Sequence, residues 1–203
     1  MEHQNINNDA LSKDPRILKT RLAVCRTVLN YLSQGRTFDS LTISEVAAAA
    51  GVTRKTLYAR FGSLEQVVQE IAFEMFTNVV ATIDDEDLRG PTIEHPLTIV
   101  VFRALESEKN TLVPLITMCS SSLVIEPAGR VFRQLLDRII EVNHHAPLTS
   151  FQRDYLTAIV GSTVHGMMRV WIQRNFVDSA DELAALFIGI LGPGFEVLMK
   201  DSR

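Results

Sequence analysis

The sequence has few of the residues that mark secreted, disulfide-bonded or membrane-spanning proteins. Its 203 residues include two cysteines, Cys25 and Cys119, which form neither a metal-ligand spacing nor a disulfide framework. The longest apolar stretches are too short or too interrupted to cross a bilayer. The polar first thirteen residues also lack the apolar segment of a signal peptide. We therefore expect a cytoplasmic protein without membrane contact.

The motifs that carry common enzyme chemistry are also missing. There is no nucleophile elbow, no phosphate-binding glycine loop, no HExxH and no paired-cysteine motif. Cys119 precedes three serines, but no triad partners are positioned around it. The adjacent His144 and His145 lack the i,i+4 spacing of helical metal ligands and favour a surface pair. We predict that the chain is not an enzyme and uses no metal or other cofactor.

Strand patterns are missing as well, because no segment sustains an alternation of apolar and polar residues. Helical spacing is frequent instead, and its clearest stripe comprises Leu18, Leu22, Cys25, Leu29 and Leu32. Beyond the first four helices, we expect helices at about 96–109, 111–123, 127–143, 151–174 and 179–199. Pro127 suits a first turn, and Gly192-Pro193-Gly194 should break or kink the last helix. The sequence therefore predicts an all-α fold.

The charge of the chain is unevenly distributed. The formal net charge is −4, which by itself argues against a protein that coats nucleic acid. From Lys13 to Phe61, however, nine basic residues face three acidic ones, so this segment carries +6 and the rest carries −10. A basic head on an acidic body suggests a polyanion-binding module joined to a second functional unit.

The segment from Thr42 to Phe61 satisfies the requirements of a helix-turn-helix. Ala47 is small enough for a helix crossing, and Gly51 tolerates the positive φ of the turn. Apolar residues can pin the second helix onto the first, and hydrogen-bond donors gather at the start of the second helix. An ordinary helical hairpin with a solvated charged face is the alternative. The four features together within twenty residues favour DNA binding.

The stretch ISEVAAAAGVTRKTLYARFGSLEQVV resembles the DNA-binding segment of TetR-type transcriptional regulators. The specific resemblance covers roughly residues 15–75, and the remainder is similar in length, helical character and a late tryptophan-bearing helix. It implies an all-α homodimer, usually a repressor, with a three-helix helix-turn-helix head and a C-terminal ligand-binding and dimerisation domain. We accordingly expect a disordered arm at 1–13, a DNA-binding domain at 14–62 and a regulatory domain at 63–203.

The resemblance also implies roles for individual residues. Thr42, Thr53 and Thr56 match phosphate-binding polar positions, and Arg54 and Lys55 match positions that enter the major groove. The predicted DNA-binding set is Thr42, Thr53, Arg54, Lys55, Thr56, Tyr58 and Arg60. Leu64 departs from the family, which usually has a phosphate-binding lysine there.

The last two expected helices carry more apolar residues than one narrow core stripe needs. We therefore predict that they pair with a second copy as a four-helix bundle, although the same residues could instead form internal core. The predicted interface residues are Tyr155, Ile159, Trp171, Leu183, Phe187 and Ile190.

A second group of residues is predicted to line a pocket for a small apolar or amphipathic effector, with ordinary core as the alternative. These residues are Phe102, Met118, Cys119, Phe132, His165, Met168 and Trp171. The resulting functional prediction is a transcriptional regulator that binds a palindromic double-stranded operator as a homodimer and is released by the effector. The alternative is a helical adaptor, or a regulator controlled by a protein partner rather than a ligand.

Overall fold

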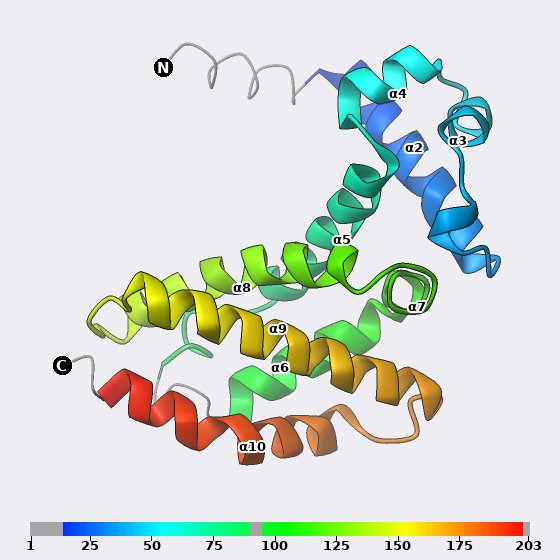
Figure 1. Ribbon diagram of the computed structural model, residues 1–203. Coiled ribbons are helices and arrows are strands. Elements are labelled where there is room, and N and C mark those ends of the chain that lie inside the picture. Colours follow the sequence, from blue (N-terminus) through cyan, green and yellow to red (C-terminus); the bar gives the residue numbers. More distant parts are fainter. Residues whose placement is uncertain (1–13, 90–94, 201–203) are drawn as a thin grey trace, which may run out of the picture.

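The computed structural model describes residues 14–89 and 95–200, and within these ranges it contains α-helices and no β-strand (Figure 1). The helices are α2 (Pro15–Ser33), α3 (Ile43–Ala49), α4 (Arg54–Phe61), α5 (Leu64–Ala81), α6 (His95–Ser107), α7 (Lys109–Met118), α8 (Ser122–Val142), α9 (Ser150–Gln173) and α10 (Ala180–Lys200). A short 3-10 helix, η1 (Phe38–Ser40), precedes α3. The predicted all-α fold is confirmed over these ranges, whereas the predicted arm at residues 1–13 lies outside them.

The first helices begin where side chains can cap them. Asp14 accepts a hydrogen bond from the backbone N–H of Arg16 at 2.8 Å, and Pro15 occupies the first turn of α2. Ser63 Oγ accepts from the backbone N–H of Gln66 at 3.3 Å at the start of α5. These caps satisfy amide groups that have no partner within the helix, so local sequence determines where these helices start.

Two prolines lie inside helices. Helix α8 begins at Ser122, so Pro127 lies inside it rather than in its first turn. Helix α10 continues through Pro193. A proline removes a helix hydrogen bond, but tertiary packing can outweigh that loss. Pro127 is buried in α8, and Phe195, two residues after Pro193, is 4% exposed. We infer that packing of these buried side chains stabilises the helical conformation on both sides of each proline.

The helices form a small head and a larger body joined by α5 (Figure 1). Helices α2, α3 and α4 make the head, and α5 runs from the head into the body, where it packs against α8. In the body, α8 packs on α9, and α6 packs on α10. Helix α2 also contacts α7, which gives the head a second attachment to the body. One buried apolar cluster extends through both parts.

No helix in the described ranges is long and apolar enough to span a bilayer.

Candidate DNA-binding site and internal cavity

The turn between α3 and α4 is fixed by one glycine and two backbone hydrogen bonds. Gly51 has φ +68°, a left-handed conformation that side chains with a Cβ rarely adopt. The N–H of Gly51 donates to the carbonyl of Ala48 at 3.2 Å, and the N–H of Val52 donates to that of Ala47 at 2.9 Å. Both bonds close the end of α3, so α4 leaves at a defined angle.

Buried side chains hold α4 against the rest of the head. Val46 and Leu57 are 0% exposed, and Ala47 is 1% exposed, as expected for a helix crossing. Phe61 is also buried. The Arg21 guanidinium stacks on its ring, with Arg21 Cζ 5.4 Å from the ring centroid. Arg21 Nε in turn donates to Glu70 on α5 at 2.9 Å. The orientation of α4 is therefore set from α2, α3 and α5 together.

The start of α4 presents hydrogen-bond donors and positive charge to solvent. Thr53 Oγ1 accepts from the backbone N–H of Thr56 at 3.0 Å and lies 2.8 Å from Thr56 Oγ1. Arg54 and Lys55 are exposed in the first helical turn. Cations are unfavourable there, because the helix macrodipole places partial positive charge at the N-terminus. A bound anion would offset this repulsion, which makes the start of α4 a suitable contact for a polyanion.

Further polar side chains extend this surface along α4. Tyr58 is 54% exposed, and Arg60 is exposed in the last turn. Arg54 Nη1 lies 3.5 Å from Ser44 Oγ, so the arginine reaches back toward the start of α3. Within residues 14–89 and 95–200, none of the three cations of α4 takes part in an ion pair. Their charge remains available for a partner outside the chain.

Thr42 contributes differently, because its hydroxyl is part of a capping box. The backbone N–H of Glu45 donates to Thr42 Oγ1 at 3.3 Å, and Glu45 Oε2 accepts from the Thr42 N–H at 3.3 Å. Glu45 also pairs with Arg36, and this hydrogen bond is the main reason why the pKa of Glu45 is lowered. Arg36 itself stacks on Tyr31, with Cζ 4.7 Å from the ring centroid. Arg36 therefore positions α3, and Thr42 stays exposed beside it.

Leu64 stands where the resemblance implies a phosphate-binding lysine, and its side chain is buried. It is the first residue of α5 and only 6% exposed, so its side chain is part of the buried core. A buried leucine contributes packing rather than a phosphate contact. The exposed cations of α4 are therefore the more suitable polyanion contacts in this chain.

The head has the geometry of a helix-turn-helix on a helical body, and part of its sequence matches a known family. Residues 32–71 match the family model described as bacterial regulatory proteins, tetR family. This segment of the head is therefore similar in sequence to bacterial regulatory proteins of the tetR family.

Solved structures share the fold over almost the whole chain. The TetR family repressor AlkX from Dietzia sp. strain DQ12-45-1b, implicated in biodegradation of n-alkanes, is 21% identical, with a TM-score of 0.54 over 87% of this chain and 98% of that one. NalD, the secondary repressor of the MexAB-OprM multidrug efflux pump in Pseudomonas aeruginosa, is 18% identical, with a TM-score of 0.54 over 90% and 98%. The dihydroxyacetone kinase operon activator DhaS is 13% identical, with a TM-score of 0.52 over 89% and 98%. A search of curated protein sequences gave no significant match.

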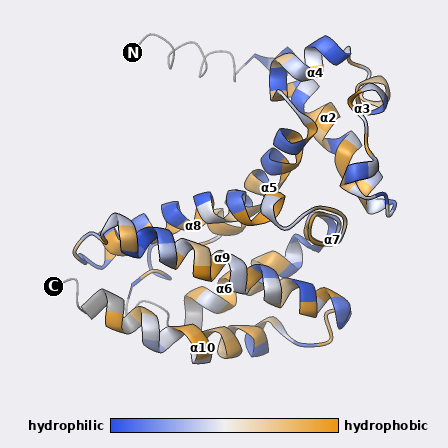
Figure 2. Cartoon of the chain, viewed as in Figure 1, coloured by the Kyte–Doolittle hydropathy of each residue, from blue (hydrophilic) through white to orange (hydrophobic). Residues whose placement is uncertain are grey.

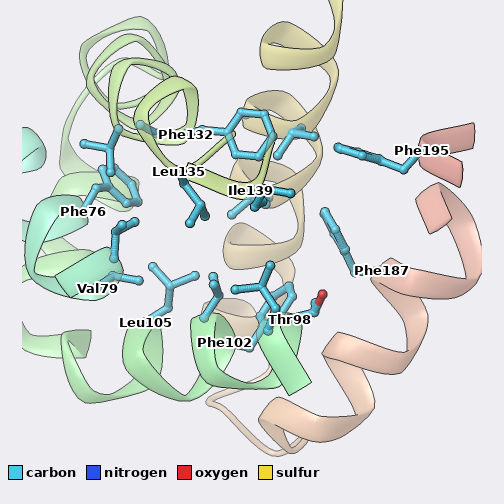
Figure 3. Close-up of a pocket in the computed structure, with 18 residues that line it drawn as sticks. Phe76, Val79, Thr98, Phe102, Leu105, Phe132, Leu135, Ile139, Phe187 and Phe195 are labelled. Atoms are coloured by element: carbon cyan, nitrogen blue, oxygen red, sulfur yellow. The ribbon is translucent and has the colours of Figure 1, made fainter. Parts of the chain in front are cut away.

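The body contains an apolar cavity of about 130 Å³ between α5, α6, α8, α9 and α10 (Figure 3). Among the described residues that line it, Thr98 is the one whose side chain carries a polar atom. The lining residues are Phe76, Val79, Val80, Leu97, Thr98, Val101, Phe102, Leu105, Ala128, Val131, Phe132, Leu135, Ile139, Val160, Gly161, Val164, Phe187 and Phe195. Side chains from widely separated segments therefore line one cavity.

Two of the seven residues predicted to line an effector pocket, Phe102 and Phe132, line this cavity. The structure places the other five outside its lining: Met118, Cys119, His165, Met168 and Trp171. Sequence reasoning also missed the α5 contribution from Phe76 and Val79. The spacing of Val131, Leu135 and Ile139 on one face of α8 was a usable signal for that wall, because residues four apart share a helix face.

The six residues predicted to form a dimer interface fall into two groups. Trp171, Leu183 and Phe187 are 1%, 7% and 7% exposed, so they are packed inside the single chain. Tyr155, Ile159 and Ile190 are 61%, 50% and 61% exposed. Further exposed apolar side chains on α9 and α10 are Phe151, Val170, Leu186 and Val197. Apolar segments recur along both helices in Figure 2.

The two cysteines are expected to react slowly with alkylating reagents. Burial raises the pKa of Cys25 to about 12, with a further contribution from the Glu70 charge, and burial raises that of Cys119 to about 12. A raised pKa keeps a thiol protonated, so its thiolate fraction stays small until the pH approaches that value. At pH 8 we expect iodoacetamide to react roughly a thousandfold more slowly than with a free cysteine, whose pKa is about 8.5.

Mass spectrometry of the folded protein between pH 7 and pH 10 measures these rates. Unfolding in guanidinium chloride should restore the rate of a free cysteine at the same pH. Rapid labelling of the folded protein at pH 8 would contradict the shielding of both thiols.

Proposed function

We propose that the protein is a repressor that binds a palindromic operator as a homodimer in the cytoplasm and releases it when a small molecule enters the body cavity. The main support is the exposed set of donors and unpaired cations at the start of α4, held rigidly by a buried helix crossing. Of the three comparison structures cited above, two are described as repressors and one as an activator.

In this proposal, α4 enters the major groove and reads bases. Arg54 and Lys55 stand in its first turn, the part of a recognition helix that approaches base edges. Arg54 can donate two hydrogen bonds to one guanine, which gives about 1–3 kcal/mol of discrimination against other bases. Thr42, Thr53, Thr56, Tyr58 and Arg60 would contact phosphates, which position the protein without reading sequence.

Dimerisation supplies the second recognition helix. Exposed apolar residues recur at four-residue spacing on α9, at Phe151, Tyr155 and Ile159, and on α10, at Leu186 and Ile190. A soluble monomer rarely exposes a continuous apolar stripe of this kind. Two-fold pairing of α9 and α10 with a second copy would cover it as a four-helix bundle. Two α4 helices would then reach successive major grooves about 34–36 Å apart.

Helix α5 is the suitable connection between cavity and DNA. Its first half is packed with the head, where Val67 and Val68 are 0% exposed, and Glu70 pairs with Arg21 on α2. Its second half supplies Phe76, Val79 and Val80 to the cavity wall. A ligand that binds better when this half of α5 is displaced would therefore disfavour the DNA-bound arrangement, and by linkage DNA would weaken ligand binding equally.

Arg54→Ala is expected to relax operator specificity, whereas Thr42→Ala should weaken binding to all DNA sequences alike. The first substitution removes a base-reading guanidinium, and the second removes a hydroxyl placed for phosphate. Selection of bound sequences from random DNA gives the operator, and fluorescence anisotropy then measures affinities for the operator and for unrelated DNA. We expect Arg54→Ala to reduce the ratio of these affinities by about tenfold or more, corresponding to 1–3 kcal/mol.

Arg130→Ala is a matched control, since it removes the same charge from α8, where Arg130 lies over Phe73. Thr42→Ser retains the capping hydroxyl and should bind like the wild type. An unchanged affinity ratio in Arg54→Ala would refute base reading by Arg54. The affinity of a DNA-binding protein for its operator falls steeply as the salt concentration rises. An affinity that hardly changes with salt would therefore favour the alternative of a helical adaptor.

A further inference from the structure

We infer that the cavity takes an uncharged hydrocarbon of about the size of a single benzene ring, carrying at most one hydroxyl-sized polar group. This inference rests on the proposed effector function and specifies the chemical class of the effector. It is narrower than the apolar or amphipathic molecule expected from the sequence, because it excludes an ionised head group inside the cavity.

The walls of the cavity are aromatic and aliphatic. Figure 3 shows Phe76, Phe102, Phe132, Phe187 and Phe195 arranged around the space from α5, α6, α8 and α10. The rings of Phe102 and Phe187 pack edge to face, with centroids 6.0 Å apart. An apolar ligand would gain dispersion contacts with these walls.

The volume limits the size of the ligand. The cavity measures about 130 Å³. An engineered cavity of about 150 Å³ lined by leucine, isoleucine and phenylalanine stays dry and binds benzene or xenon. The cavity of this protein has a similar size and a similar lining. A single ring or a short aliphatic chain of comparable volume fits it, whereas a multi-ring compound would extend beyond it.

The lining also excludes charge. None of the eighteen described residues that line it is ionisable, so a carboxylate or ammonium group among them would lose hydration without gaining a counter-ion. The pairs Arg138–Asp85 and Arg103–Asp181 lie near the same helices, but these arginines are already engaged with carboxylates and do not line the cavity. A charged analogue of a binding hydrocarbon should therefore be rejected.

Thr98 gives the cavity one point of polar recognition. Thr98 lies on α6 and is 6% exposed. Figure 3 shows its side-chain oxygen among the carbon atoms of the lining. A hydroxyl can donate to or accept from a single hydroxyl on a ligand. The expected order of affinity is therefore benzene and phenol well above benzoate, with Thr98 affecting phenol alone.

The test is binding of these three compounds to the full-length protein without DNA, followed by chemical shifts of methyl-labelled valine and leucine. We expect benzene to saturate the shifts of cavity methyls such as those of Val79 and Leu135. Benzoate should bind at least about tenfold more weakly, in line with the cost of burying an unpaired charge. Thr98→Val should weaken phenol several-fold and leave benzene unchanged.

Two variants locate the site. Val131→Phe adds bulk inside the cavity and should reduce benzene affinity about tenfold or more, because overfilled space leaves no room for the ring. Val177→Phe makes the same change at a position that is 77% exposed and does not line the cavity, and it should bind benzene normally. If Val131→Phe does not fold, the comparison of benzene with benzoate in the wild type decides the question.

Benzoate binding as tightly as benzene, or an absence of benzene shifts in cavity methyls, would overturn the inference. Operator release is measured separately by anisotropy with benzene present. If benzene binds in the cavity but operator affinity does not change, the ligand class is upheld and the proposed effector function fails.

Discussion

Ile159→Asp is expected to convert the proposed dimer into a monomer and to lower operator affinity by about 100-fold or more, since one half-site supplies only part of the contacts that specific DNA binding needs. Ile159 is 50% exposed on α9, within the stripe that contains Tyr155. In a two-fold interface each substitution occurs twice, so two carboxylates would be buried without partners. Light scattering coupled to size-exclusion chromatography measures the mass, and anisotropy measures the affinity.

Leu18→Asp is the control for the measurement of oligomeric state. Leu18 is a similarly exposed apolar residue, 51% exposed, but it lies on α2 in the head. This variant should keep the mass of the wild type. A dimeric Ile159→Asp protein with unchanged operator affinity would show that the α9 stripe is not the interface. A wild-type protein that is monomeric at micromolar concentration would refute the dimer altogether.

Trp171→Ala is expected to lower the free energy of unfolding by about 3–5 kcal/mol, the usual cost of truncating a buried aromatic side chain. Trp171 is 1% exposed, and its ring centroid lies 6.4 Å from that of Phe102 and 5.0 Å from that of Phe176. Its Nε1 donates to the backbone carbonyl of Asp178 at 2.8 Å. The tryptophan therefore joins α9 to the wall of the cavity and to the loop that leads into α10.

Urea denaturation at one fixed protein concentration measures the change, because dimerisation makes apparent stability concentration-dependent. Trp171→Phe is the matched variant. It keeps a ring in the core but loses the hydrogen bond, so it should cost less than the alanine substitution. A loss below about 1 kcal/mol in Trp171→Ala would contradict the core role of this side chain, because surface substitutions change stability by only about 0.5 kcal/mol.

The head was largely predictable because its determinants are local. Asp14, Thr42, Thr53 and Ser63 each cap a helix within three residues of their own position. Gly51 provides the turn that only a residue without a Cβ forms easily. The exposed position of Arg54 and Lys55 follows from the buried positions of Leu57 and Phe61 on the same short helix. Such features depend on short spacings that the sequence contains in full.

The cavity was only partly predictable, because its lining is a tertiary property. Phe76 and Phe195 are more than a hundred residues apart in sequence and line the same cavity. Phe187 has a helical spacing that fits either an interface or a core, and the structure places it in the cavity wall. Trp171 fitted both the predicted pocket and the predicted interface, and it is packed inside the chain. Hydrophobic periodicity predicts which face of a helix is buried, but it does not predict which other helix or subunit covers that face.

The sequence by itself therefore determined the helical class, the capped helix-turn-helix and the concentration of positive charge in the head. Those properties arise from hydrogen bonds, glycine conformations and charges within a few residues of one another. Only the tertiary structure decided which apolar side chains face the cavity, which fill the core and which remain exposed on α9 and α10. The physical reason is that hydrophobic burial has no intrinsic direction, so the packing of whole helices selects the partners of each apolar face.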